Sequence, residues 1–458
     1  MMTKAKENTT AAAGRRPRRK GWLALTPLLL LALLMGGLGV AFGDFYKVPM
    51  TVVFLIVGIA SLFTLRGLSV EERIETFSRG AGQRDLLLMV WIFVLAGAFA
   101  KSAQAMGAVS ATVDLTMYFL PSNMLLAGLF LSACVVSLCV GTSVGTIVAL
   151  VPVAAEVAGR TATPVALMVA AVVGGAFFGD NLSFISDTTV AATRTQGCSM
   201  RDKFRTNFRI VLPAAVLCFV IYLVMGLNSG TATASQQPIE LHLWRVLPYA
   251  FVLVSAIAGL NVLLSLCSGL VLTAVVGVAD GALTPADWLQ NVAEGISGMG
   301  ELILVSLMAG GLLSVVRRAG GMTYLVRGIT RRVHSRRGAE VCIALLVSLT
   351  NLCTANNTVA ILSVGSIVSD LSTRYGVDRR RSASLLDIFS CIVQGIIPYG
   401  AQLLMASGLA AVSTIAIIPY LYYQPLLAVA ALTSIALCKG KRAHRASLQQ
   451  SDGVLSAR

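Results

Sequence analysis

The sequence predicts an all-α, polytopic membrane protein made of two inverted-topology repeats, with broken helices or re-entrant hairpins in each. The first reason is composition: 56% of the 458 residues are apolar and only 12% are charged, whereas a soluble domain has about 25% charged residues. The second is a series of long apolar stretches from Trp22 to Leu437. The third is a weak repeat of the first half in the second, with opposite loop charge.

The basic residues that give the chain its net charge of +15 lie mainly at the two ends and in short segments between apolar stretches. The run from Arg15 to Lys20 precedes an apolar stretch of about 20 residues, which is long enough to span a bilayer and longer than the core of a signal peptide. Because cytoplasmic segments carry the excess of Lys and Arg, we expect both termini in the cytoplasm. We therefore expect a bacterial inner-membrane protein whose basic charge faces the lipid bilayer and not nucleic acid.

Short motifs of the first half return in the second half at a nearly constant distance. Gly97 lies in a motif that matches the one at Gly310, 213 residues later (310 − 97). Further along, Asn357 corresponds to Gly145, at an offset of 212 (357 − 145). Few residues are identical, so the constancy of the offset is what indicates an internal repeat.

The charge of the connecting segments indicates that the second copy is inverted. Segment 66–85 contains four arginines, whereas its counterpart at 280–300 contains three acidic residues and no basic one. Segment 317–338 contains seven arginines, and its counterpart at 107–121 contains one aspartate as its only charge. Lys203 is counted with its neighbouring arginines in a further cytoplasmic loop. Inverted repeats are an architecture of secondary transporters, whose binding site lies near the midplane where broken helices of both copies meet.

This pattern divides the chain into six segments. They are a disordered basic N-terminal tail at 1–20, a first transmembrane repeat at 21–200, a connecting helix and loop at 201–243, a second, inverted repeat at 244–410, a final transmembrane helix at 411–438, and a cytoplasmic tail at 439–458. We expect about 11 to 14 membrane segments, because a helix needs about 20 apolar residues to span the bilayer.

Polar sequence interrupts the apolar spans at two places in each copy. The interruptions lie at 139–146 and 179–189 in the first copy, and at 351–358 and 394–402 in the second. Unpaired backbone polar groups are costly in lipid, so such sequence must line a cavity or the protein interior. We therefore search these four segments for ligands.

Asp180 and Asp187 are the principal candidates for binding a sodium ion. They are two helical turns apart, which places them on one face if the segment is helical. A partly buried carboxylate binds a proton or a cation in competition, and that competition is sufficient for antiport. The alternative is a polar loop at the cytoplasmic surface, in which Asp187 pairs with Arg194. Neutral oxygen ligands beside the two carboxylates are offered by Asn181, Ser183, Ser186 and Thr188.

Further candidates come from the other copy and from the first interruption. Asp387 is a third acidic candidate flanked by apolar residues, although it could instead pair with Arg380 or Arg381 near the membrane surface. Hydroxyl groups in the first interruption could be ligands or could bond to carbonyls of their own helix. The hydroxyl and amide candidates are Thr142, Ser143, Thr146, Asn356 and Asn357.

The segment from Gly179 to Thr189 resembles the Gly-Asp-x-x-Ser-Pro-Ile-Ser-Asp-Thr-Thr motif of NhaC-type sodium/proton antiporters, within the ion transporter superfamily. The resemblance extends over roughly 22–437, and implies hairpin-broken transport regions and a scaffold able to form a homodimer. Phe184 stands here in place of the motif proline. In the second copy Asp387 is retained, but Leu386 replaces the glutamate that the family has there, which leaves the substrate open.

The sequence therefore favours exchange of a small inorganic cation, sodium, for protons. The alternative is sodium- or proton-coupled transport of a small organic acid or amino acid; no buried arginine is evident to bind a carboxylate, although helix N-termini can do so. An intramembrane aspartyl protease is disfavoured because Asp180 and Asp187 lie in one short motif and not on two facing helices. We expect no enzymatic activity and no cofactor, since the nine cysteines and three histidines show no metal-ligand spacing.

Overall fold

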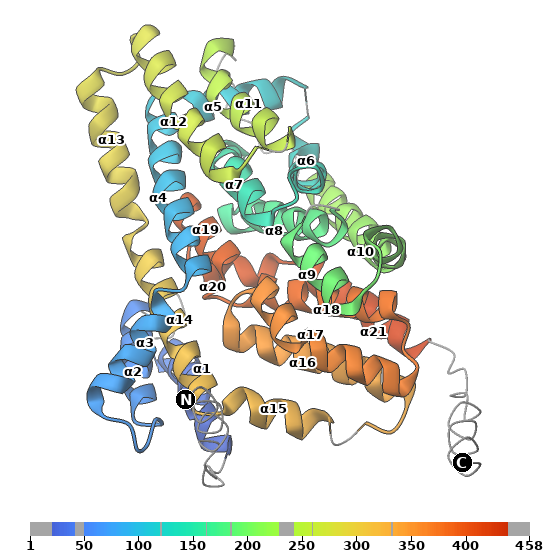
Figure 1. Cartoon of the computed structure of the whole chain (residues 1–458). Coiled ribbons are helices and arrows are strands. Elements are labelled where there is room, and N and C mark those ends of the chain that lie inside the picture. Colours follow the sequence, from blue (N-terminus) through green and yellow to red (C-terminus); the bar gives the residue numbers. More distant parts are fainter. Residues whose placement is uncertain are drawn as a thin grey trace, which may run out of the picture.

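The computed structural model describes residues 21–41, 50–119, 121–161, 163–183, 186–228, 242–258, 260–330 and 333–437. The predicted tails at 1–20 and 439–458 lie outside the described residues, as does most of the loop expected before residue 243. Figure 1 shows the arrangement of the helices.

Every regular element in the described ranges is a helix. Among the residues that the structure describes, eight helices or helix pairs are long and apolar enough to cross a membrane, and a ninth span results if the bent pair at 414–436 is counted as one. Four shorter apolar helices accompany them, at Trp22–Leu31, Met50–Leu62, Leu125–Val140 and Leu243–Ser255. The prediction of an all-α, polytopic membrane protein is confirmed. The final helix expected at 411–438 is broken, with a bend of 52° between its two parts.

The helices of the first half are η1 (Gly21–Leu25), α1 (Thr26–Ala41), α2 (Met50–Leu62), α3 (Val70–Ala81), α4 (Arg84–Ala105), α5 (Ala108–Phe119), η3 (Ser122–Met124), α6 (Leu125–Val140), α7 (Ser143–Thr161), α8 (Val165–Leu182), α9 (Asp187–Gln196) and α10 (Met200–Asn228). Those of the second half are α11 (Leu243–Ile257), α12 (Val262–Ala279), α13 (Pro285–Gly298), α14 (Gly300–Arg318), α15 (Gly321–Thr330), α16 (Arg336–Thr354), α17 (Asn357–Tyr375), α18 (Arg379–Ile396), α19 (Ala401–Ala410), α20 (Thr414–Ile417), η4 (Ile418–Tyr420) and α21 (Tyr423–Ala436).

The helix boundaries of α6 to α9 recur in α16 to α19. Helix α7 begins at Ser143 and α17 at Asn357, an offset of 214 (357 − 143), and the starts and ends of α8 and α9 recur in α18 and α19 with the same offset. The sequence alignment, which used 212 here, was therefore wrong by two residues: Asn357 corresponds to Ser143 and not to Gly145. By the same offset, Gln394 of α18 corresponds to Asp180 of α8.

The residues that end these helices also correspond. Helices α6 and α9 end at Gly141 (φ 74°) and Gly197 (φ 62°), in the left-handed region. Their counterparts after α16 and α19 are Ala355 (φ 48°) and Ala411 (φ 53°). Glycine adopts this conformation at little steric cost, whereas alanine is strained by its Cβ. The second copy therefore keeps the same backbone breaks with a less suitable residue.

A hydrogen bond ties the first and third helices of each four-helix group together. The hydroxyl of Ser137 in α6 donates to the carbonyl oxygen of Ala176 in α8, at 2.6 Å. The amide of Asn351 in α16 donates to the carbonyl oxygen of Ser390 in α18, at 2.7 Å. Both partners are shifted by 214 residues, so the packing of the helices recurs as well as their lengths.

Glycines allow helices of the two halves to interleave at close range. A Cβ on Gly97 of α4 would lie 2.3 Å from the carbonyl oxygen of Gly295 in α13, and a Cβ on Gly80 of α3 would lie 2.5 Å from that of Gly310 in α14. Two helices of the first half, α3 and α4, thus pack directly against two helices of the second half, α14 and α13. In Figure 1 these long helices stand beside the groups α6 to α9 and α16 to α18, which lie one above the other.

The counterparts α5 and α15 lie at opposite ends of the molecule in Figure 1, which agrees with the inverted topology that the sequence predicts; the inversion itself stays a prediction. The orientation of the two copies in the bilayer, like the six-segment division of the chain, stays a prediction.

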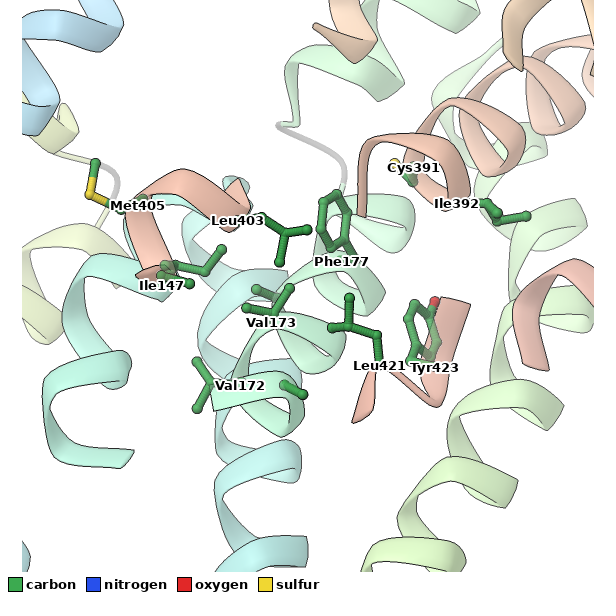
Figure 2. Close-up of a cluster of buried hydrophobic side chains, with 14 of the residues drawn as sticks. Ile147, Val172, Val173, Phe177, Cys391, Ile392, Leu403, Met405, Leu421 and Tyr423 are labelled. Atoms are coloured by element: carbon green, nitrogen blue, oxygen red, sulfur yellow. The ribbon is translucent and has the colours of Figure 1, made fainter. Parts of the chain in front are cut away.

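The core between the two groups is apolar and centred on α8, which is buried along nearly its whole length. Figure 2 shows Val172, Val173 and Phe177 of α8 facing side chains of α7, α18 and α19, and the labelled Leu421 and Tyr423 beside them. Close packing on all sides of α8 holds its C-terminal end, where polar residues begin, in a fixed place.

Candidate functional site

Helix α8 ends in the middle of the protein, where the sequence predicts a break. It stops at Leu182, and α9 begins at Asp187 with Ser186 as its N-cap. Asp180 lies in the last turn of α8 and is only 5% exposed. Asp187 is exposed in the first turn of α9, where a carboxylate is favoured by the helix dipole. The break between the two helices therefore separates the carboxylates that a continuous helix would have placed on one face.

The carboxylate of Asp180 is held by hydroxyl groups from two other helix starts. Its Oδ2 accepts a hydrogen bond from Ser143 Oγ at the start of α7, at 3.0 Å. Its Oδ1 accepts from Ser186 Oγ, and the hydroxyls of Ser186 and Thr188 lie 2.9 Å apart. Two of the four predicted interruptions thus meet at one buried carboxylate.

A second buried carboxylate, Asp387 of α18, forms an ion pair with Lys203 of α10. The distance from Lys203 Nζ to Asp387 Oδ2 is 2.7 Å, and the two side chains are 1% and 0% exposed. Lys203 Nζ also donates to the carbonyl oxygen of Asn181, at 2.8 Å, and to Thr189 Oγ1, at 2.6 Å. All three donors of the ammonium group are therefore used.

Asn207, one turn after Lys203 on α10, joins the two carboxylates into one cluster. Its Nδ2 donates to the carbonyl oxygen of Asn181 and to Asp387 Oδ2, both at 2.9 Å. Because Asn181 directly follows Asp180, the polar network runs from the end of α8 through α10 to α18. We call the residues Asp180, Asn181, Lys203, Asn207 and Asp387 the central cluster.

Several oxygen atoms of the central cluster accept no hydrogen bond from the part of the chain that the structure describes. They are Asn181 Oδ1, Asn207 Oδ1 and Asp387 Oδ1, and all three are buried. A buried acceptor without a donor is costly. A cation is a natural partner for such oxygens, because hard cations take carboxylate, amide and carbonyl oxygens as ligands.

The second copy reaches Asp180 through two glutamines. Gln394 Nε2 donates to Gln402 Oε1 at 2.9 Å, and Gln402 Nε2 donates to Ser143 Oγ at 3.1 Å. Ser143 in turn donates to Asp180. The hydrogen bonds therefore run in one direction, from the break between α18 and α19 to the carboxylate in α8.

The remaining predicted ligands have local roles in the structure. Asn356 caps α17, since its Oδ1 accepts from the backbone N–H of Val359 at 3.0 Å. The hydroxyl of Thr146 donates to the carbonyl oxygen of Thr142, one turn earlier in the chain, at 3.1 Å. Asn357 is buried beside Cys391, with 4.0 Å between Nδ2 and Sγ. Ser183 is buried at the end of α8, and Thr188 is buried in α9.

The sequence interpretation missed Lys203 and Asn207. Lys203 was assigned to a cytoplasmic loop because four arginines surround it, but it is buried in α10. The alternative left open for Asp387, a pairing with Arg380 or Arg381, is not what the structure has: Arg380 pairs with Asp378 and Asp202, and Arg381 with Glu340. The one available signal was the spacing of Lys203 and Asn207, four residues apart and hence on one face of a helix.

A cavity of about 510 Å³ lies at the far end of α19 from Gln402. It is lined by the end of α19 (408–411) and by residues of α4, α7 and α13, among them Glu156. Lys101 and Glu294 also line it and form an ion pair of 3.6 Å. Within the described ranges, no group of three or more His, Cys, Asp or Glu side chains is placed to hold a metal ion.

Comparison with known proteins gives one family and several distant relatives. The sequence profile of the Na+/H+ antiporter family matches residues 24–227 and 231–438. An uncharacterized Na(+)/H(+) antiporter of Haemophilus influenzae is 23% identical over 87% of this chain and 92% of its own length. The Na(+)/H(+) antiporter NhaC of Bacillus subtilis is 24% identical over 76% and 83%. The malate-2H(+)/Na(+)-lactate antiporter of Bacillus subtilis is 22% identical over 73% and 77%.

Proposed function

Because this chain belongs to the Na+/H+ antiporter family, we propose that it exchanges sodium ions for protons across the bacterial inner membrane, at a site built on Asp180 and Asp387. The family membership confirms the resemblance to NhaC-type antiporters, and it supports the expectation of a transporter without enzymatic activity. One observation carries the proposal. Asp180 is buried where α8 is interrupted, and its carboxylate is surrounded by hydroxyl groups from two different helix starts.

The hydroxyl shell of Asp180 suits both a proton and a cation. A serine hydroxyl has one donor and two acceptor positions. Ser143 and Ser186 therefore donate to the ionised carboxylate, accept from the protonated one, and offer lone pairs to a sodium ion bound beside it. Since the proton and the cation use the same carboxylate, binding of one releases the other. Such competition, repeated on the two sides of the membrane, produces exchange.

Asp387 supplies the second carboxylate of the proposed site. Its Oδ1 is buried and takes no hydrogen bond from the described residues, and the backbone carbonyl of Asn181 links it to Asp180 through Asn207. We propose that Asp187, which is exposed, attracts cations toward the break between α8 and α9. Ser183, Thr188 and Asn357 complete the polar lining from the two copies, and Thr142, Thr146 and Asn356 hold the backbone of the breaks.

An organic substrate is less well supported by the central cluster. A carboxylate substrate is bound by a cationic side chain or by a helix N-terminus, and the cation within the central cluster is Lys203. Its three N–H groups are already bonded to Asp387, Asn181 and Thr189. The homodimer and the cytoplasmic position of both termini remain predictions of the sequence.

Everted membrane vesicles from a host without its own sodium/proton antiporters provide the test. An acid-inside pH gradient is imposed, sodium, lithium or potassium is added, and a fluorescent pH probe reports the gradient. We expect sodium to collapse the gradient in vesicles with the wild-type chain and not in those with Asp180→Asn. Asp370→Asn, an exposed carboxylate of α17, is the matched control and should behave as wild type.

Two results would contradict the proposal in different ways. A wild-type chain that responds to none of the three cations would rule out cation/proton exchange. A full sodium response of Asp180→Asn, at equal amounts of protein in the membrane, would leave the exchange standing and remove Asp180 from its site.

A further inference from the structure

The ammonium group of Lys203 is enclosed by oxygen atoms from three helices. They are a carboxylate oxygen of Asp387 in α18, the carbonyl oxygen of Asn181 in α8 and the hydroxyl oxygen of Thr189 in α9, at 2.7, 2.8 and 2.6 Å. The side chain is 1% exposed. Lys203 is thus a monovalent cation held in a closed oxygen cage within the protein.

The cage has the composition of a site for a hard metal cation. Carboxylate, backbone carbonyl and hydroxyl oxygens are the ligands that such ions take in proteins. Asn181 is the last but one residue of α8, so its carbonyl oxygen belongs to the negative end of the helix dipole, which favours a positive charge. Asp387 Oδ1, the second oxygen of the same carboxylate, is also buried and accepts no hydrogen bond from the described part of the chain.

The cage therefore offers more oxygens than one ammonium group can use. An ammonium group has three donors, and each is directed at one cage oxygen, so the second carboxylate oxygen of Asp387 stays without a donor. A metal ion has no fixed donor directions and takes more oxygen ligands. The surplus of acceptors fits a metal ion better than it fits the lysine that is there.

We infer that Lys203 is a tethered competitor of the transported cation: its ammonium group occupies the sodium position, and sodium binds by displacing it from Asp387 and Asn181. This inference rests on the proposed sodium/proton exchange and specifies how its site is kept closed when no sodium is bound. Besides Asp387 of α18, which contacts Lys203 directly, the ionisable groups near enough to interact with its charge include Asp180 of α8, Cys391 of α18 and Cys198 after α9.

The alternative is that the ion pair only fastens α10 to α18. In that case removal of Lys203 leaves a buried, unpaired carboxylate and destabilises the fold. The affinity for sodium does not increase. If Lys203 is a competitor, its removal instead raises the affinity for sodium, because the apparent affinity depends on the fraction of protein whose site is open. The affinity for sodium of Lys203 variants therefore separates the two.

Sodium binding to the purified, full-length protein in detergent is measured by calorimetry for the wild type, Lys203→Gln and Lys203→Arg. We expect Lys203→Gln to bind sodium about tenfold more tightly or better, since its site is always open. Lys203→Arg keeps the charge permanently and should bind at least as weakly as wild type. Unchanged or weaker binding by a folded Lys203→Gln would overturn the inference.

A measurement on the wild type keeps the test decisive if Lys203→Gln does not fold. Lysines are methylated reductively in buffer that contains either sodium chloride or choline chloride at equal ionic strength. Mass spectrometry of peptides then gives the extent of methylation at each lysine. We expect sodium to raise the labelling of Lys203 several-fold and to leave that of Lys101, which is half-exposed, unchanged. Protection or constant labelling of Lys203 in protein that binds sodium would overturn displacement. Absence of sodium binding by the wild type would instead overturn the proposed function, and the inference with it.

Discussion

Gln402 and Ser143 belong to opposite halves of the chain, and the amide of Gln402 donates to the hydroxyl of Ser143 across 3.1 Å. Ser143 passes the contact on by donating to Asp180. Both residues lie at helix breaks, Ser143 at the start of α7 and Gln402 at the start of α19. Any movement of one break against the other therefore changes the surroundings of the carboxylate.

Ser143→Ala removes the hydroxyl that donates to Asp180 Oδ2. A hydrogen bond to a charged group is worth about 1.5–3 kcal/mol, so we expect the sodium concentration at half-maximal response in vesicles to rise about tenfold to a hundredfold. Ser143→Thr keeps the hydroxyl and should remain within a few-fold of wild type. Equal values for Ala and wild type would show that Ser143 is not a ligand.

Asp387→Asn leaves the ammonium group of Lys203 buried without its counter-charge. Breaking one partner of a buried pair costs about 3–5 kcal/mol, so the midpoint of thermal unfolding in detergent should fall clearly below that of wild type. The double variant Asp387→Asn with Lys203→Gln removes both charges and should recover most of the loss. A double variant as unstable as the two single losses combined would mean that the pair is not coupled.

Ala355→Gly relieves a left-handed alanine at the break between α16 and α17. The strain of roughly 1–2 kcal/mol is partly offset by the greater freedom of glycine in the unfolded chain, so we expect a gain of up to about 1 kcal/mol. Ala309→Gly, within α14, is the matched control and should destabilise by about 0.5–1 kcal/mol. Thermal unfolding of the two variants, side by side, gives the signs.

Gly97→Ala forces α4 away from α13, because the added Cβ lies 2.3 Å from a carbonyl oxygen of the facing helix. Overpacking costs about 1–3 kcal/mol, and the yield of monodisperse protein in size-exclusion chromatography should fall. Gly298→Ala makes the same change in α13 where a Cβ meets nothing within 4 Å. That variant should be as stable as wild type or slightly more so, and a loss equal to that of Gly97→Ala would refute the packing argument.

The sequence was sufficient to predict the helical membrane fold and the break after Asp180, because apolar length and interrupting polar residues act locally. It also matched segments 66–85 and 280–300, which contain α3 and α13, and the two helices do begin alike, with capping boxes at Ser69 and Thr284. The offset between the copies was two residues too small at α7 and α17, because short motifs with few identities determine it only to within a few residues.

The site was harder to predict, because charges were judged by their neighbours in the chain. Lys203 stands among arginines and was therefore assigned to the cytoplasm, yet the end of α8 and Asp387 of α18 enclose it. Asp187 was named with Asp180 as a principal ligand, because a spacing of seven places both on one face if the segment is helical. The sequence indicates a break in this segment, and the structure shows that it falls between the two residues and leaves Asp187 exposed.

The glycine contacts between α4 and α13, and between α3 and α14, have a consequence for biogenesis. Gly97 and Gly295 are 198 residues apart (295 − 97), and a ribosome adds about 5–20 residues per second. After α4 emerges, about 10 to 40 s pass before α13 is made. During that interval the face of α4 that contains Gly97 is in contact with lipid or the insertion machinery. Neither half can reach its native packing alone, so a ribosome stalled midway leaves a fragment suited to proteolytic removal and not a smaller working transporter.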